Sequence, residues 1–400
     1  MKQVLVIIDG LSDDPISEIG ENTPLEVAFI PNIHYIASTG MTGRIDTYFE
    51  GYPIESLVCN MALLGYDPRK YYPSGRASFE ALAKGIPIKK DDLVLRCNIV
   101  SIKDGSLIDF TAGMISDSEA RKIISGLNLP YKGWEIYPGQ SYRNTLVIRS
   151  ANISPQNIKC YEPHMNIGKS INDILPESIE VNSDSLKLVE EINNFLLDSQ
   201  EQIKKIETLG GNKEDKMLWV WSPSSSPYWP SYKKIMNKKA ALVAGLDFFH
   251  GMAMAAGIHY DVIPNATGYI DTDYRKKGEY AINYLKVYDF VIVHVNAADE
   301  AAHARDWNEK IKAIESVDRY IIGPLMYELE KNHKDDYRIA VCGDHKTRCS
   351  DGKHIGDPVP FAFSGVGVEA SKNKFTEKDC LNEPLYNSLE FLNKTLFRGE

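Results

Sequence analysis

Three short apolar runs in this chain each lead into side chains of the kind that bind metal ions. The runs are Val4–Ile8, Phe290–Val295 and Ile339–Cys342, and the side chains that follow them are Asp9, then Asp299 and His303, then Asp344, His345 and His354. Short, continuously apolar strands are typical of a parallel sheet that helices cover on both faces. In such sheets, ligands bind at the carboxyl ends of the strands. The pattern therefore predicts an α/β fold with these side chains at one sheet edge.

The same side chains are oxygen and imidazole donors, which suit divalent cations such as Mg²⁺, Mn²⁺ or Zn²⁺. Asp299 and His303 are spaced one turn apart on a predicted helix, a spacing that purely structural helices also show. Asp9 could equally cap a turn, and His345 could be a satisfied core residue. An ordinary surface has no need of ligand-type residues at three separate strand ends. The joint pattern therefore favours two adjacent cation sites over the structural alternative.

A serine that could act as a nucleophile, Ser56, lies in a loop just before a predicted apolar helix. A serine there could also be only the N-cap of that helix. The two roles are compatible, because the unpaired N–H groups of a helix N-terminus can bind a phosphoryl oxygen. Two cations with a nucleophilic hydroxyl between them are the equipment for phosphoryl transfer.

Composition excludes some classes of protein. The net charge of −10 leaves no basic excess for meeting a phosphate backbone, which argues against a nucleic-acid-binding protein. The cysteines show no CxxC spacing and are expected to be free thiols of a reducing compartment, with Cys342 and Cys349 structural rather than ligands. The chain starts directly with a strand, and no apolar run approaches the roughly 20 residues of a membrane span. We therefore expect a cytoplasmic protein with neither nucleic acid nor membrane as a partner.

The predicted elements change character twice along the chain. Residues 1–90 and 216–400 alternate short strands and helices, whereas residues 91–215 hold strands typical of a mixed or antiparallel sheet. We therefore expect a core domain built from the two outer segments, with residues 91–215 inserted as an α+β cap. In this scheme a core strand is expected at Leu218–Trp221, a polar linker at Glu201–Asp215, one long helix at Trp307–Lys331 and the final strand at Pro358–Phe363.

Motifs along nearly the whole chain resemble those of a known family. They lie at Val6–Leu11, Thr23–Glu26, Asn60–Pro68, Gly75–Ile86, Asn265–Thr272, His294–His303 and Asp357–Phe361. In these segments the chain is similar to the archaeal-type, cofactor-independent phosphoglycerate mutases of the alkaline phosphatase superfamily. The resemblance implies an alkaline-phosphatase-like core, a mobile cap, and two divalent ions, usually Mn²⁺, Mg²⁺ or Zn²⁺.

The resemblance also implies roles for individual residues. One ion would be held by Asp9, Ser56, Asp344 and His345, and the other by Asp299, His303 and His354. Ser56 would take the phosphoryl group and return it to another hydroxyl of a small phosphorylated metabolite. Arg143 and Arg76 are candidates for clamping the phosphate, although Arg76 could instead pair with Glu80. His164 could position substrate or merely pack, and Lys169 is a further candidate for substrate contacts.

The chain departs from the family pattern on the substrate side. Five positions carry replacements, namely Leu57, Met114, Asn144, Met165 and Ser222. Because these replacements remove polar partners, we expect interconversion of 2- and 3-phosphoglycerate to be weak. A phosphatase or phosphotransferase acting on another phosphoester or phosphonate is the first alternative. The second alternative is a catalytically silent relative that only binds its ligand.

Overall fold

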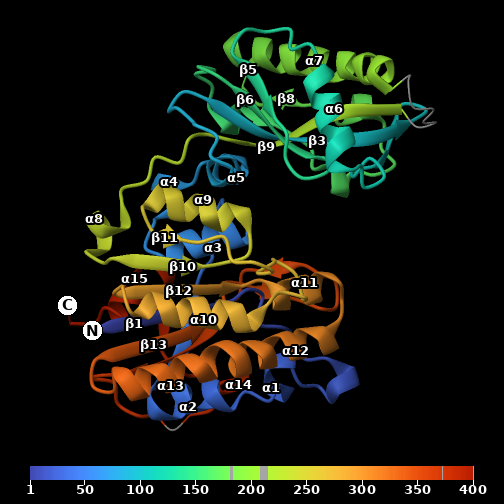
Figure 1. Cartoon of the computed structure of the whole chain (residues 1–400). Coiled ribbons are helices and arrows are strands. Elements are labelled where there is room, and N and C mark those ends of the chain that lie inside the picture. Colours follow the sequence, from blue (N-terminus) through green and yellow to red (C-terminus); the bar gives the residue numbers. More distant parts are fainter. Residues whose placement is uncertain (181–182, 208–214, 372, 400) are drawn as a thin grey trace. The chain divides into compact units, whose positions relative to one another are not determined.

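The computed structural model describes residues 1–180, 183–207, 215–371 and 373–399 (Figure 1). The chain forms two compact units, the first made of Met1–Tyr72 and Trp229–Glu400 and the second of Pro73–Tyr228. No helix among the described residues is long and apolar enough to span a membrane.

The first unit is built on an eight-stranded mixed sheet with strand order β11-β10-β12-β1-β13-β16-β2-β17. These strands are β11 (His259–Tyr260), β10 (Ala240–Val243), β12 (Phe290–Val295), β1 (Lys2–Ile8), β13 (Tyr337–Cys342), β16 (Val359–Gly365), β2 (Met41–Asp46) and β17 (Leu385–Asn387). The strands from β11 to β13 run parallel, and only β16 runs antiparallel to its two neighbours. The predicted α/β class with a mostly parallel sheet is thus confirmed.

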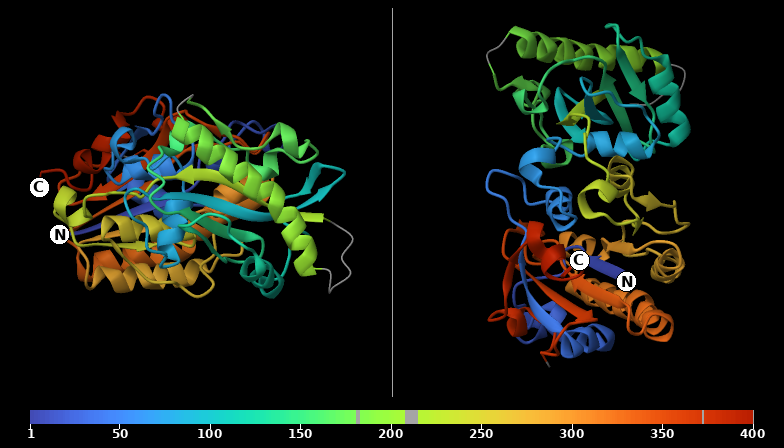
Figure 2. Two further views of the ribbon diagram at one scale, coloured as in Figure 1. Left: turned by 90° about the horizontal axis from the view of Figure 1, so that it is seen from above. Right: turned by 90° about the vertical axis from the view of Figure 1, so that its left-hand side faces the viewer.

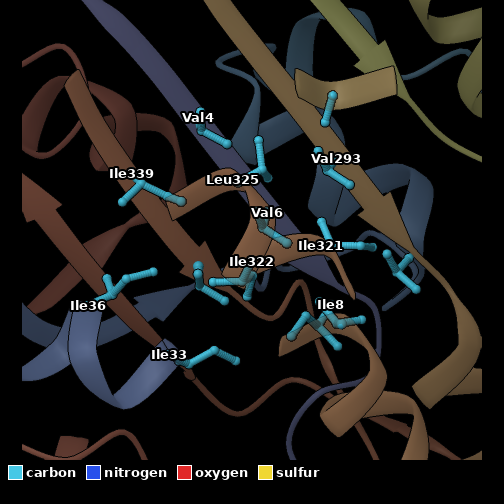
Figure 3. Close-up of a cluster of buried hydrophobic side chains, with 14 of the residues drawn as sticks. Val4, Val6, Ile8, Ile33, Ile36, Val293, Ile321, Ile322, Leu325 and Ile339 are labelled. Carbon is cyan, nitrogen blue, oxygen red and sulfur yellow. The ribbon is translucent and has the colours of Figure 1, made fainter. Parts of the chain in front are cut away.

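Helices pack on this sheet through an aliphatic core. Figure 3 shows Val4, Val6 and Ile8 of β1 pointing among isoleucines and a leucine of the flanking helices, namely Ile33, Ile36, Ile321, Ile322 and Leu325, all of them buried. The helices of this unit are α1 (Pro24–Val27), α2 (Pro31–Thr39), α3 (Ser56–Leu63), α4 (Pro68–Tyr71), α8 (Tyr232–Met236), α9 (Asp247–Ala256), α10 (Tyr274–Leu285), α11 (Ala297–His303), α12 (Trp307–Val317), α13 (Gly323–Asn332), α14 (Glu377–Cys380) and α15 (Ser388–Lys394). A short hairpin of β14 (Lys346–Thr347) and β15 (His354–Ile355) and a 3₁₀ turn, η1 (Ser17–Ile19), complete the unit.

Two predictions for this unit need correction. The expected single helix at Trp307–Lys331 is α12 and α13 joined by a π-helical segment, Asp318–Ile322. Pro324 has no N–H to continue the regular ladder, and the Tyr320 carbonyl instead faces Gly278, where a Cβ would approach it to 2.5 Å. The sheet also does not end with the strand predicted at Pro358–Phe363, because β17 pairs with β2 at the edge.

The second unit contains a five-stranded antiparallel sheet of order β4-β3-β6-β5, with β9 pairing on the other side of β3. The strands are β3 (Leu93–Lys103), β4 (Ser106–Asp109), β5 (Trp134–Tyr137), β6 (Arg143–Ile148) and β9 (Asp215–Ser224), beside a small pair of β7 (Ile158–Lys159) and β8 (Glu177–Ser178). The helices are α5 (Ala77–Ala83), α6 (Asp117–Gly126) and α7 (Ser183–Glu207), with 3₁₀ turns η2 (Pro155–Asn157), η3 (Pro163–Met165) and η4 (Ile171–Asp173). Helix α7 covers one face of this sheet (Figures 1 and 2), where Ile192 and Phe195 join the buried core.

The division between the units falls at residues other than the predicted boundaries at 90 and 216. The strand predicted as a core element at Leu218–Trp221 is β9, which pairs with β3 of the second sheet. Helix α5 also belongs to the second unit, where Ala77 and Ala81 pack against Val94 and Val147. The expected linker at Glu201–Asp215 is wrong for residues 201–207, which continue α7; residues 208–214 lie outside the described part. Lysine and glutamate are good helix formers, so a charged stretch is compatible with a solvated helix.

Candidate active site

Strand order brings the ligand-type residues of the first unit together. Strand β1 lies between β12 and β13, so Asp9 follows β1 beside the segments that follow its two neighbours. Asp344 and His345 follow Gly343 at the end of β13, while Asp299 and His303 lie on α11 just beyond β12. The short β14–β15 hairpin pairs Thr347 with His354 and so returns that histidine to the same edge.

The first cluster contains Asp9, Asp344 and His345, all fully buried. The Nε2 atom of His345 lies 3.2 Å from Asp9 Oδ1 and 3.7 Å from Asp344 Oδ2. Ser56 Oγ donates to Asp9 Oδ2 at 3.1 Å and lies 3.3 Å from His345 Nε2. The serine hydroxyl therefore points into a group of potential cation ligands.

The second cluster is centred on the Asp299 carboxylate. The Nε2 atom of His303 lies 3.2 Å from Asp299 Oδ2, and that of His354 lies 3.3 Å from Asp299 Oδ1. The two Nε2 atoms are 3.0 Å apart. His345 is also near enough to share an ion with Asp299 and His354, so it lies within reach of both clusters.

The backbone fixes how the two outer histidines can bind. His303 Nδ1 lies 2.8 Å from the Gly352 carbonyl, and His354 Nδ1 lies 2.8 Å from the Ile54 carbonyl. A carbonyl oxygen only accepts, so each Nδ1 carries the proton and each Nε2 of a neutral ring presents a lone pair. Two lone pairs at such a short separation beside a carboxylate repel each other unless a positive charge lies between them. The donor set therefore fits a divalent cation.

Electrostatics of the clusters support the same fit. Burial, followed by repulsion from Asp344 and Asp299, raises the pKa of Asp9 well above its ordinary value. Burial also acts to raise the pKa of Asp299, but hydrogen bonds from His303 and His354 in their protonated form overcome it and hold that pKa well below its ordinary value, and a cation would take the place of those protons. Burial lowers the pKa of His345 and favours the neutral ring that a metal ligand requires. Buried carboxylates of this density need cations as partners.

Several positioning residues escaped the sequence reasoning. Asn60 Nδ2 donates to Asp344 Oδ2 and to the Ser56 carbonyl, both at 2.8 Å. Gly10 N donates to Asp344 Oδ1 at 3.2 Å. Thr347 contacts ligands of both clusters. The one available signal was the spacing of Asn60, four residues after Ser56 on the predicted helix.

A further histidine, His294, is the next-to-last residue of strand β12 and lies opposite Ile7 of β1. Its ring is buried against Phe249, with centroids 3.8 Å apart, and its Nε2 lies 3.3 Å from Asp9 Oδ2. Burial lowers the pKa of His294 well below its ordinary value. A histidine inside an otherwise apolar strand was the sequence signal for this contact.

The cysteines near the clusters are buried free thiols. Burial raises the pKa of Cys349 to about 12 and that of Cys342 well above its ordinary value. A thiol with a raised pKa is a poor metal ligand, because the ligand form is the thiolate.

The predicted substrate-binding residues all lie in the second unit. The Arg143 guanidinium lies over the Tyr142 ring at 5.0 Å, and Tyr142 packs edge-on against Phe110. His164 packs against Phe110 and Trp221, with centroids 6.1 and 5.6 Å away. Arg143 and His164 thus flank one aromatic cluster.

Of the other two candidates, Arg76 is linked to that cluster through Arg96, whose guanidinium lies over the Trp221 ring at 4.4 Å. Arg76 Nε is 3.7 Å from Glu80, which also binds Arg96, in line with the structural alternative weighed for Arg76. Lys169 is exposed, and its carbonyl accepts from Leu107 N at 3.0 Å.

Known proteins are similar to this chain in sequence and in fold. Residues 37–208 match the profile of the 2,3-bisphosphoglycerate-independent phosphoglycerate mutases. A protein of that name from Methanothermobacter thermautotrophicus is 37% identical, over 96% of this chain and 93% of its own length. One from Methanothrix thermoacetophila is 36% identical over 92% of each chain.

Solved structures agree with these matches. The cofactor-independent phosphoglycerate mutase from Thermoplasma acidophilum is similar with a TM-score of 0.67 and 27% identity, over 99% of both chains. A protein from Pyrococcus horikoshii is similar with a TM-score of 0.78 and 26% identity, over 98% of this chain and 96% of its own. The chain therefore belongs to the archaeal-type, 2,3-bisphosphoglycerate-independent phosphoglycerate mutase family, and it shares the α/β fold of the Thermoplasma acidophilum member.

Proposed function

We propose that this protein is a phosphoglycerate mutase-type phosphomutase that moves a phosphoryl group between two hydroxyls of a small metabolite through phospho-Ser56. The observation that carries the proposal is the position of the Ser56 hydroxyl, 3.1 Å from Asp9 and 3.3 Å from His345 in a buried set of ligand atoms. Family membership makes the phosphoglycerates the first substrates to test, because the curated relatives carry that name.

Each residue of the site has a definite task in this proposal. Asp9, Ser56, Asp344 and His345 would hold one divalent cation, and Asp299, His303 and His354 the other. Bound cations would lower the pKa of the serine hydroxyl and neutralise phosphoryl oxygens. Asp9 accepts the Ser56 hydroxyl proton in its hydrogen bond, and Asn60 ties the Ser56 carbonyl to Asp344. The nucleophile is thereby oriented before substrate binds.

The second unit would supply the substrate contacts. Arg143 presents a planar guanidinium, which can bind a phosphate or carboxylate through two parallel hydrogen bonds. His164 lies beside the same aromatic cluster, and burial lowers its pKa, so the neutral ring can accept or donate a hydrogen bond. Exclusion of water from phospho-Ser56 would separate a mutase from a phosphatase.

Three measurements test the proposal directly. Metal analysis and a structure at saturating Mn²⁺ should show two cations per chain, roughly 3.5–4 Å apart as in other two-metal sites. Brief incubation with a phosphoglycerate followed by rapid acid quench and peptide mass spectrometry should locate a phosphate on Ser56. Carboxylates of Asp299 and Asp344 bound to distant ions, or a phosphate on another residue, would contradict the proposal.

A second candidate is a phosphatase or phosphotransferase acting on another phosphoester or phosphonate. The observation that favours it is the exposure of Met114 and Met165, 69% and 71%, at two positions where the chain departs from the family pattern. Exposed thioethers offer a substrate apolar contact and no charge. Release of inorganic phosphate without formation of an isomer would select this candidate. A protein that binds two cations and phosphoglycerate but does not convert the phosphoglycerate would be the silent relative.

A further inference from the structure

Thr347 lies between the two ligand clusters and contacts both. Its side chain is fully buried in β14. Its Oγ1 donates to Asp299 Oδ1 at 2.6 Å, and His345 Nδ1 lies 3.1 Å from the same oxygen. One hydroxyl therefore joins a ligand of the second cluster to a ligand of the first.

The number of available protons determines which atom donates in each of these two hydrogen bonds. A threonine hydroxyl has one proton, and an ionised carboxylate can only accept. The short bond to Asp299 uses the threonine proton, so the bond between Oγ1 and His345 must use a proton on Nδ1. The chain of donors runs from His345 Nδ1–H to Thr347 Oγ1–H to Asp299 Oδ1. His345 Nε2, which faces Asp9 and Ser56, is consequently left with a lone pair.

The surrounding backbone is built to hold this hydroxyl in place. Thr347 N donates to the Ser12 carbonyl at 3.2 Å, and the Thr347 carbonyl accepts from Lys310 Nζ at 2.7 Å. Gly10 leaves the necessary room, because a Cβ there would approach Thr347 Oγ1 to 2.9 Å and Asp299 Cα to 2.8 Å. Gly10 also has a φ of +64°, a conformation that favours glycine.

We propose that Thr347 is a positioning residue shared by the two cation sites: its hydroxyl fixes the Nδ1–H tautomer of His345 for one site and the orientation of Asp299 for the other. The assignment of the cation sites rests on the proposed function, whereas the assignment of the His345 tautomer rests only on the hydrogen bonds of Thr347. Partners that bond to metal ligands typically change metal affinity by about 10–100-fold when they are removed. Loss of this one hydroxyl should lower the cation affinity of both sites. Two sites whose ligands were positioned independently would not be weakened together.

The first test needs no metal. Long-range ¹H–¹⁵N spectra of the metal-free protein with labelled histidine should show His345 as the Nδ1–H tautomer in the wild type and in Thr347→Ser. In Thr347→Val the hydroxyl is lost, and the spectrum should show the other tautomer or a mixture. An Nε2–H tautomer in the wild type, or an unchanged tautomer in Thr347→Val, would overturn the proposal whatever the protein catalyses.

The second test is a titration of each protein with Mn²⁺ alone, followed by calorimetry and electron paramagnetic resonance. Thr347→Val should weaken both binding steps by about 10–100-fold, and Thr347→Ser should stay within about threefold of the wild type. Thr395→Val is the matched control, because Thr395 is another fully buried threonine whose Oγ1 donates 2.6 Å to the Phe391 carbonyl. This control should bind Mn²⁺ like the wild type.

The outcomes separate the two proposals. A wild type that binds no Mn²⁺ overturns the two-metal function, and the tautomer result still decides the role of Thr347. Normal binding by the wild type with only one step weakened in Thr347→Val overturns the shared role. If Thr347→Val does not fold, Thr347→Ala takes its place in both experiments, with Thr347→Ser as the rescue.

Discussion

At the scale of single residues, the site is a group of polar side chains around buried carboxylates, and the partners of these side chains set their protonation. Carbonyls of Gly352 and Ile54 fix the two outer histidines, and Thr347 does the same for His345. Asn60 and Gly10 occupy the oxygens of Asp344. The ligand atoms are thus oriented by uncharged groups, and cations would supply the missing positive charge.

Ser56→Ala should abolish turnover while the fold and at least one cation site survive. Ser56 supplies the covalent step, whereas carboxylates and imidazoles supply most of the metal affinity. Steady-state kinetics and Mn²⁺ titration on the same preparation measure both effects. A variant that keeps a tenth of the wild-type kcat would exclude a phosphoserine route, because the loss of about 1.4 kcal/mol is too small for a nucleophile.

Lys277 should make the stability of the protein depend on pH. Its side chain is fully buried, its Nζ donates to the Thr267 carbonyl at 3.3 Å, and burial lowers its pKa from 10.5 to about 7. Because the folded pKa is the lower one, the unfolded chain binds the proton more tightly. The Lys277 contribution to stability is therefore complete above pH 10.5 and declines as the pH falls towards 7, by at most about 1.4 kcal/mol per pH unit.

Lys277→Met removes the titrating group and should flatten this dependence. Urea unfolding of both proteins at pH 7.5, 8.5 and 9.5 measures it. The variant should gain stability relative to the wild type as the pH falls. A stability difference that is constant over this range would show that Lys277 keeps its proton in the folded protein.

At the scale of elements, one buried lysine fixes the loops that carry the ligands. Lys310 of α12 donates to the Ser12 carbonyl, to Asp13 Oδ2 and to the Thr347 carbonyl, at 3.0, 2.9 and 2.7 Å. The side chains of Lys310 and Asp13, which form an ion pair, are both buried. Helix α12 therefore holds together the loops that follow β1 and β13.

Lys310→Met should cost about 3–5 kcal/mol of unfolding free energy, because it leaves Asp13 buried without its cation. Lys312→Met on the same helix is the matched control, since Lys312 is 65% exposed in its ion pair with Glu309 and should change stability by less than about 0.5 kcal/mol. Urea titrations of the three proteins measure the difference. Equal midpoints and slopes for the two variants would mean that the buried pair contributes nothing.

Sequence patterns predicted the elements that local rules control. Apolar runs followed by Asp9, Asp299 and Asp344 marked the site, because the carboxyl ends of parallel strands meet at one edge of a sheet. Strand β9 was assigned to the wrong sheet, since an apolar run such as Leu218–Trp221 does not reveal its partner. The contacts of Thr347 and Lys310 join segments that are far apart in the chain, so no local sequence pattern predicts these contacts.

At the scale of the whole molecule, the proposed chemistry and the proposed substrate contacts lie in different units. The first unit holds Ser56 and the ligand clusters, and the second unit holds Arg143 and His164. Each unit buries a core of its own. Replacements in the second unit can therefore change substrate preference without disturbing the ligand clusters.

Interconversion of 2- and 3-phosphoglycerate should proceed with kcat/KM below about 10⁴ M⁻¹s⁻¹, the lower end of ordinary enzyme values. Met114 and Met165 are exposed side chains without charge, Leu57 leaves no acid beside the nucleophile, and the buried amide of Asn144 donates to the Tyr142 carbonyl at 3.1 Å. Each polar group of a substrate that is buried without a partner costs about 1–3 kcal/mol. Several such losses together reduce the rate by powers of ten.

A coupled enolase assay on Mn²⁺-loaded protein decides the question, with Met114→His and Met165→Asp as the informative variants. Because both side chains are exposed, these substitutions should not disturb the fold, and the double variant should raise kcat/KM for phosphoglycerate at least tenfold. Ser56→Ala in the same background should remove that gain, which shows that it arises at the proposed site. A wild type already above 10⁴ M⁻¹s⁻¹ would mean that neighbours such as Glu55, Arg143 or Lys169 have taken over the contacts. In that case the protein recognises the substrate of the family by different residues.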